Sequence, residues 1–180
     1  SPAEARPHPP SSAPRVKKQL ARPKDAPVPD TDATDEAPPS MVDWDARVAH
    51  IDARPVDATA AAVRFIQLWH DEPHALRLGA DELARIASHL RFFSVPAHQQ
   101  VIGQDEQGNY LLIVLEGRIG VERLQAGGPR TRLAEVHPGD MIGEMSVLDA
   151  GSRFSACTTL SPCVIAVLDA PRLVGMMEAE

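Results

Sequence analysis

The segment of residues 139–158 reads GDMIGEMSVLDAGSRFSACT and places a glycine, an acid and a base close together in the chain. Gly143 permits a close backbone approach, and a short turn of helix that starts at Glu144 would point free N–H groups at an anion. Arg153 carries a planar fork of donors that suits phosphate, whereas the Glu144 carboxylate only accepts and suits a pair of sugar hydroxyls. This combination predicts a pocket for a small nucleotide.

The chain around this segment alternates short β-rich runs with turn residues. The predicted strands are residues 101–102, 110–115, 119–124, 133–136 and 163–168. The turns between them are predicted at 107–109, 117, 126–129 and 138–140. Short strands with glycine-rich turns at this spacing are typical of a small antiparallel sandwich or barrel. We therefore expect a mainly β fold, a jelly-roll-like antiparallel β-roll with helices before and after it.

Apolar residues recur at helical spacing on both sides of the β-rich part. They predict short amphipathic helices within 41–51 and 63–69, a clearer one over 81–90, and a last one that begins after Pro171. Residues 1–40 are rich in proline and hold almost no large apolar side chain, so burial cannot offset their ordering entropy. We expect a disordered tail over 1–40, a helical extension over 41–78 and the β-roll over 79–180.

Charge and composition restrict the partners. Six basic and six acidic residues cancel within residues 1–40, so the net charge of −7 falls on the rest of the chain. Nucleic-acid binding needs clustered cations and is disfavoured, although the basic block at 15–24 is either a solvated linker or a site for a partner. No apolar run approaches a membrane span, and the two cysteines have no disulfide or metal pattern. These features predict a soluble, cytoplasmic protein without membrane contact.

Five short motifs together make the sequence recognisable. They are Val95-Pro96-Ala97, Gly108-Asn109-Tyr110, Leu115-Glu116-Gly117-Arg118-Ile119, Pro138-Gly139-Asp140, and Gly143-Glu144 with Arg153 nine residues after the glutamate. With these motifs, residues 79–180 resemble the cyclic-nucleotide-binding domain family, which includes the catabolite activator protein and the regulatory subunits of cyclic-AMP-dependent kinase. The step from Glu144 to Arg153 agrees with the phosphate-binding cassette of that family.

The resemblance implies a regulatory sensor rather than an enzyme, with a small cyclic nucleotide as its ligand and no cofactor or metal. Glu144 would hold the ribose 2′-hydroxyl and Arg153 the cyclic phosphate. Backbone amides near four further residues would complete the anion site: Gly143, Met145, Ser155 and Ala156. Ligand binding would shift a following helix, and a partner or neighbouring domain would read that shift.

The sequence departs from the family pattern after the arginine. Phe154 stands where the family has a small or hydroxyl residue that touches the base, and Ser155 and Ala156 are exchanged relative to the usual order. No threonine directly follows Arg153, so the guanine contact of cyclic-GMP readers lacks a donor, and cyclic AMP is the expected ligand. The family also closes its pocket with a helix after the roll, and residues 171–180 correspond to the helix before that lid.

Several alternatives stay open. Phe154 and the exchanged pair also motivate a degenerate roll that acts without ligand as an interaction or homodimerisation module through the helices of 41–70. A second alternative is that the ligand is a cyclic dinucleotide. A third is that the chain is a transcription regulator whose DNA-reading domain is missing. A cupin-type metalloenzyme would need clustered histidines, and in residues 70–74, HDEPH, proline interrupts the helix that a zinc motif requires. Cys157 is either a redox switch or, as we expect, an inert packed thiol.

Overall fold

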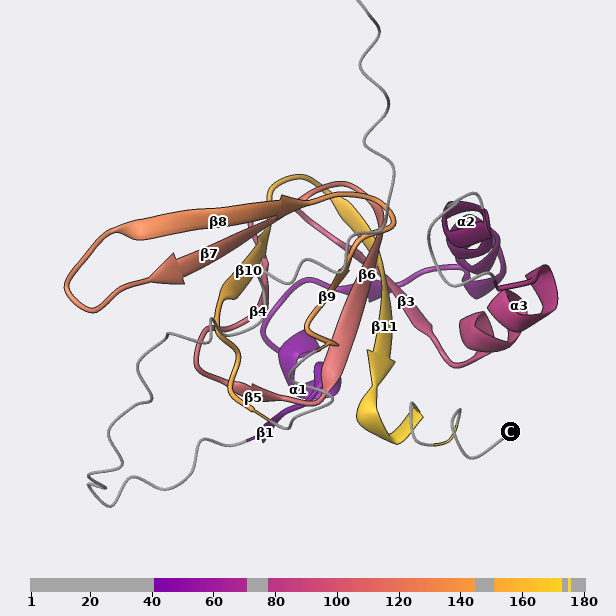
Figure 1. Ribbon diagram of the computed structural model, residues 1–180, viewed down its shortest axis with the longest axis horizontal. Coiled ribbons are helices and arrows are strands. Elements are labelled where there is room, and N and C mark those ends of the chain that lie inside the picture. The colour runs from indigo at the N-terminus through magenta and orange to yellow at the C-terminus, as the bar shows by residue number, and fades with distance from the viewer. Residues whose placement is uncertain (1–40, 71–77, 145–150, 173–174, 176–180) are drawn as a thin grey trace, which may run out of the picture.

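A computed structural model describes residues 41–70, 78–144, 151–172 and 175. Two antiparallel sheets form the body of this part of the chain, and two helices stand on one side of it (Figure 1). This architecture confirms the mainly β roll with helices that the sequence predicts. The expected tail over 1–40, Met145 and most of the helix predicted after Pro171 lie outside the described residues, although residues 170–172 are already helical.

The two sheets differ in size and in what covers them. The first contains, in spatial order, β4 (Gln100–Ile102), β10 (Ala156–Thr159), β7 (Ile119–Leu124) and β8 (Arg130–Val136). The second contains β2 (Arg54–Pro55), β3 (Arg91–Val95), β11 (Cys163–Asp169), β6 (Tyr110–Glu116) and β9 (Met141–Ile142). A small third sheet pairs β1 (Met41–Val42) in parallel with β5 (Gln107–Gly108). Each strand that the sequence predicts is present.

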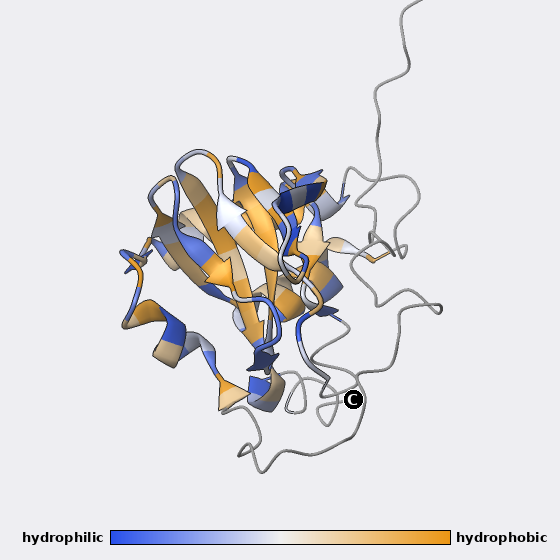
Figure 2. Cartoon of the chain, turned by 90° about the vertical axis from the view of Figure 1, so that its left-hand side faces the viewer, coloured by the Kyte–Doolittle hydropathy of each residue, from blue (hydrophilic) through white to orange (hydrophobic). Residues whose placement is uncertain are grey.

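Both faces of strand β6 are buried, which explains why its sequence is a continuous apolar run rather than an alternating one. Tyr110, Leu112 and Val114 belong to the core between the two sheets. The residues between them, Leu111, Ile113 and Leu115, belong to a second core beneath the helices. Successive side chains of a strand point to opposite faces, so a strand that is buried on both faces needs apolar residues throughout. Figure 2 shows the apolar colouring of the strands in the body of the roll.

Two helices cover the outer face of the five-stranded sheet. Helix α2 spans Ala58–His70 and helix α3 spans Ala80–Ser88. Phe65 of α2 and Leu83 of α3 are fully buried in the second core. Helix α3 ends earlier than the sequence predicts, because the amides of His89 and Leu90 bond three residues back, which tightens the last turn before β3 begins. None of the helices in the described part of the chain is both long and apolar enough to span a membrane.

The segment before α2 adds strands as well as a helix to the roll. Helix α1 spans only Trp44–Val48, because Met41 and Val42 form β1 and Asp43 caps the helix by accepting from the amide of Ala46 at 2.7 Å. The sequence predicts a longer helix here and reads 41–78 as a helical extension. In the structure Trp44 packs in the roll core, and β2 pairs with β3. Residues 41–55 therefore contribute to the roll itself.

Candidate ligand-binding site

Gly143 marks the point where β9 ends and the candidate site begins. Its φ of 86° lies in the left-handed region that favours glycine. A Cβ atom at this position would come within 2.6 Å of Nη1 of Arg153 and within 3.2 Å of the carbonyl oxygen of Tyr110. A glycine at this position therefore allows a close approach by the arginine of the same segment.

Arg153 lies inside the roll, with only 4% of its surface exposed. Its Nη1 donates to the carbonyl oxygen of Gly143 at 3.0 Å, and its Nη2 donates to that of Tyr110 at 2.6 Å. The guanidinium carbon lies 4.8 Å from the centroid of the Tyr110 ring, within the range of a cation–π interaction. Gly108 also approaches it, because a Cβ there would lie 2.5 Å from Nε of Arg153. A glycine on each of two segments therefore leaves room for one guanidinium.

The charge of Arg153 is not neutralised by any ion pair with a described residue. Burial lowers the pKa of the guanidinium from its usual value, and the nearby Tyr110, Cys157 and Glu106 oppose that effect. Two carbonyl dipoles compensate a buried cation only in part, and a counter-anion would interact strongly in such a low-dielectric place. The environment of Arg153 is therefore suited to an anion.

Glu144 follows Gly143 and is also buried, at 8% exposure. Its Oε2 atom has no hydrogen-bond partner among the residues that the structure describes. Burial raises the pKa of this carboxyl, while its own backbone amide and the charge of Arg153 act in the opposite direction. A buried acceptor without a donor is costly, so this oxygen is suited to a hydroxyl donor from a ligand.

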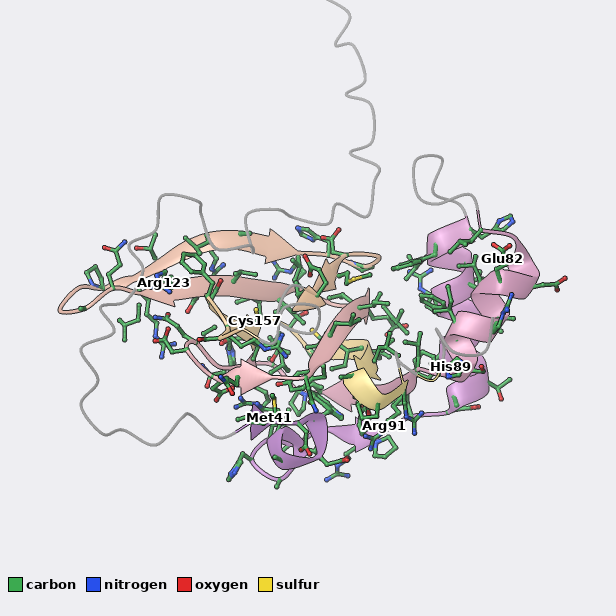
Figure 3. All side chains as sticks on the ribbon, turned by 60° about the horizontal axis from the view of Figure 1, so that its bottom comes forward. Met41, Glu82, His89, Arg91, Arg123 and Cys157 are labelled. Carbon is green, nitrogen blue, oxygen red and sulfur yellow. The ribbon has the colours of Figure 1, made fainter. Side chains whose placement is uncertain are left out.

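The residues after Arg153 form one side of the same region. Arg123 of β7 donates through Nη1 to the carbonyl oxygen of Phe154 at 2.5 Å, and its guanidinium carbon lies 4.2 Å from the centroid of the Phe154 ring. Figure 3 shows Arg123 on the β7–β8 hairpin. Ser155 and Ala156 are buried, and Ala156 begins β10 opposite Glu122. Phe154, the residue expected to face the base, thus has a second arginine beside it.

The structure brings Gly143 and Arg153 into contact and places the charge of Arg153 within reach of Glu144. It also adds three residues that the sequence did not suggest for the site: Gly108, Tyr110 and Arg123. Tyr110 is the one tyrosine of the chain, but it lies in an apolar run, which indicates core packing. Gly108 is a turn glycine by its sequence context, and no sequence signal connects Arg123 to Phe154.

A pocket of about 250 Å³ borders the expected site: Ala156 is part of its lining, and two other lining residues, Asp105 and Glu106, bond to the backbone of Arg153. Three carboxylates are among its lining residues: Asp105, Glu106 and Glu122. Carboxylates repel a phosphate, so this pocket does not suit the predicted ligand.

Two other sequence alternatives can be compared with the structure. Among the residues that the structure describes, no three His, Cys, Asp or Glu side chains form a candidate metal site. Cys157 is a free cysteine, and burial raises the pKa of its thiol to about 12. A thiol with this pKa stays protonated at neutral pH, which fits the expected inert, packed cysteine.

Fold and site together define a β-roll domain with a buried arginine and a buried glutamate in one segment. Residues 92–180 match the family model described as the cyclic nucleotide-binding domain. This part of the chain is therefore a member of that family, as the resemblance of residues 79–180 implies. The matched region begins at Phe92, the second residue of β3.

Relatives with known names are regulatory proteins. A CRP-like cAMP-activated global transcriptional regulator of Mycobacterium tuberculosis is 30% identical over 79 residues, which cover 44% of this chain and 35% of the relative. The cAMP-dependent protein kinase regulatory subunit of Mycosarcoma maydis is 31% identical over 83 residues, which cover 46% of this chain and 16% of that protein. The matched part is thus well under half of either relative.

Solved structures share the fold at lower sequence identity. The cyclic nucleotide-binding domain from Methylobacillus flagellatus has a TM-score of 0.65 at 22% identity, covering 71% of this chain and 72% of its own. The catabolite activator protein of Thermus thermophilus has a TM-score of 0.55 at 24% identity, covering 59% of this chain and 49% of its own. These likenesses support the fold of the roll.

Proposed function

We propose that this chain is a regulatory domain that binds cyclic AMP through Arg153 and Glu144 and performs no catalysis itself. The observation that carries the proposal is that one segment holds both a buried cation without a described counter-ion and a buried acceptor without a described donor. Arg153 is a buried cation without a described counter-ion, and Oε2 of Glu144 is a buried acceptor with no donor among the described residues. A ribose cyclic phosphate carries an anion and a hydroxyl a few bonds apart, so one ligand could supply a counter-ion to Arg153 and a donor to Glu144.

The residue roles follow from the chemistry of each group. The guanidinium of Arg153 would bind the exocyclic phosphate oxygens, and the carboxylate of Glu144 would accept from the 2′-hydroxyl. Backbone amides near Gly143, Met145, Ser155 and Ala156 would complete the anion site. The ring of Phe154, with Arg123 stacked on it, would lie beside the base.

Binding would also supply the conformational change that a regulator needs. Arg153 now donates to the carbonyl oxygens of Gly143 and Tyr110. A phosphate would compete with these carbonyls for the same donors, so the two states of the site would differ in how Gly143 and β6 are held. Differential contacts of this kind are what allows a ligand to shift a conformational equilibrium.

Isothermal titration with cyclic AMP, cyclic GMP and a cyclic dinucleotide tests the proposal. Arg153→Lys keeps the charge and loses the fork, whereas Glu144→Gln keeps the volume and loses the charge. We expect heat for cyclic AMP with the wild-type chain and affinity that falls at least about tenfold in each variant. The absence of heat for every nucleotide, or undiminished affinity in both variants, would remove the proposal.

A second candidate function is a ligand-independent interaction module. Its support is that Arg153 already bonds two carbonyls and that Arg123 already occupies one face of Phe154. Such a module would form dimers or capture a partner equally well with and without nucleotide. A rise in the unfolding temperature with cyclic AMP would exclude it, and size-exclusion chromatography would measure the oligomeric state directly.

A further inference from the structure

Residues 41–48 contact the same turn and the same aromatic ring that hold Arg153. We propose that Arg47, together with Trp44, is a positioning residue for Arg153, and that docking of this N-terminal segment sets the affinity of the anion site. The inference deepens the proposed function and rests on it for the identity of the ligand. Two routes connect α1 to Arg153, one through Glu106 and one through Tyr110.

The first route passes through Glu106. Nη2 of Arg47 forms an ion pair with Oε2 of Glu106, although the two residues lie 59 positions apart in the chain. The carbonyl oxygen of Glu106 accepts from the amide of Arg153 at 2.7 Å, and the amide of Asp105 donates back to the carbonyl oxygen of Arg153 at 2.7 Å. The acid that Arg47 holds therefore belongs to the turn that fixes the backbone of Arg153.

Strand β5 extends this connection. On one side Gln107 and Gly108 pair with β1, and on the other side Gln107 forms an antiparallel bridge with Ser152. Gly108 also lies against the guanidinium of Arg153. Figure 1 shows β1 and β5 side by side below the roll, next to α1. The N-terminal strand, β5 and the residue before Arg153 are thus consecutive neighbours.

The second route passes through Tyr110. The rings of Trp44 and Tyr110 meet edge to face with centroids 5.4 Å apart, and Nε of Arg47 donates to the Tyr110 hydroxyl at 3.4 Å. That hydroxyl donates in turn to the carbonyl oxygen of Val101 at 2.6 Å. The guanidinium of Arg153 stacks on the same Tyr110 ring. Movement of α1 would therefore reach Arg153 through one shared side chain.

The charges give Arg47 a specific task. Arg47 is buried, and Glu106 is its ion-pair partner. Without Arg47, the Glu106 carboxylate would lack its ion-pair partner. Arg153 is a nearby cation, and the charge of Glu106 already acts to raise its pKa. Glu106 would then compete with an external anion for Arg153. By neutralising Glu106, Arg47 leaves Arg153 available to a phosphate.

A double-mutant cycle with the full chain tests this task. Titration with cyclic AMP would compare wild type, Arg47→Gln, Glu106→Gln and the double variant. Arg47→Gln is expected to weaken binding about fivefold or more, the lower end of coupling between sites. The double variant is expected to recover most of that loss, because it no longer contains a competing carboxylate. A merely structural role for Arg47 predicts no recovery.

Asp45→Asn is the matched control. Asp45 lies in the same helix and forms an ion pair with Arg91 of β3 at 2.9 Å. Its side chain is 73% exposed, so losing this surface ion pair should change the docking of α1 little, and the substitution does not touch Glu106 or Tyr110. Figure 3 shows Arg91 beside α1. This variant is expected to bind cyclic AMP like wild type.

A ligand-free measurement separates this inference from the proposed function. The side-chain Nε–Hε resonance of Arg153, assigned by its loss in Arg153→Lys, is expected to shift in Arg47→Gln and in Trp44→Phe but not in Asp45→Asn. Near-UV circular dichroism would confirm that each variant is folded, and Trp44→Phe serves if Arg47→Gln is not. Failure of wild type to bind nucleotide would overturn the function alone. An unmoved resonance, or a double variant as weak as Arg47→Gln, would overturn the positioning role.

Discussion

At the scale of single residues, the space around Arg153 depends on glycines. Gly143→Ala would place a Cβ near Nη1 of Arg153 at a positive φ, so we expect a loss of about 1–3 kcal/mol in unfolding free energy and of nucleotide affinity. Gly139→Ala is the control, because Gly139 has a φ of 94° but nothing within 4 Å of the added atom. Urea unfolding would measure both variants. Equal losses in the two would show that contact with Arg153 contributes nothing.

Glu144 predicts a pH dependence with opposite signs for stability and binding. Its pKa is raised in the folded protein, so its contribution to stability is fully present below the unfolded-state pKa and is lost as pH rises through the folded-state pKa. Glu144→Gln is expected to remove this decline, as thermal unfolding across pH would show. Nucleotide affinity should instead fall as pH decreases through the raised pKa, because the protonated carboxyl is a poorer acceptor. A pH-independent affinity in wild type would contradict the assigned role.

Cys157 predicts the behaviour of a buried thiol. With its pKa raised to about 12, it should resist alkylation by iodoacetamide at pH 8 in the native protein and react after unfolding in urea. Peptide mass spectrometry would locate the modified cysteine. Rapid native alkylation of Cys157 would revive the redox-switch alternative.

At the scale of elements, β6 carries two cores at once. Leu112→Ala would leave a cavity between the sheets, and Leu115→Ala would leave one beneath α2 and α3. Each is expected to lower the unfolding free energy by about 2–5 kcal/mol. Leu124→Ala is the control, because that side chain is 50% exposed and should cost less than about 0.5 kcal/mol. A small effect at Leu115 would argue against tight packing of the helices on the sheet.

Elements with a local pattern were predictable from the sequence, and others were not. Strand β6 and helix α3 have apolar spacing over several residues, so their type was evident, with small errors at the ends. Strand β10 was missed because its four residues begin three positions after Arg153 and read as part of the anion segment. Strands β1 and β2 have two residues each, and pairing with a distant partner is what makes them strands.

At the scale of the whole molecule, the roll includes the segment that precedes α2. A chain that begins at Asp57 would lose β1, α1 and β2, and with them the fully buried Trp44. We expect it to unfold at a much lower temperature than a chain that begins at Met41, since loss of a buried tryptophan alone costs about 3–5 kcal/mol. Calorimetry of the two chains would measure this. Equal unfolding temperatures would show that residues 41–56 are only an appendage.

The β-roll and the Gly143, Glu144 and Arg153 segment could be predicted from the sequence, because these depend on spacing, turn glycines and apolar runs within short stretches of chain. The surroundings of Arg153 became visible only in the folded chain: the carbonyl of Tyr110 lies 43 positions away in the sequence, and Arg123 approaches Phe154 from 31 positions away. The tertiary structure likewise revealed that Arg47 reaches Glu106 and that Trp44 enters the core. Contacts of this kind follow from the path of the folded chain, which brings distant residues together and leaves no periodicity in the sequence between them.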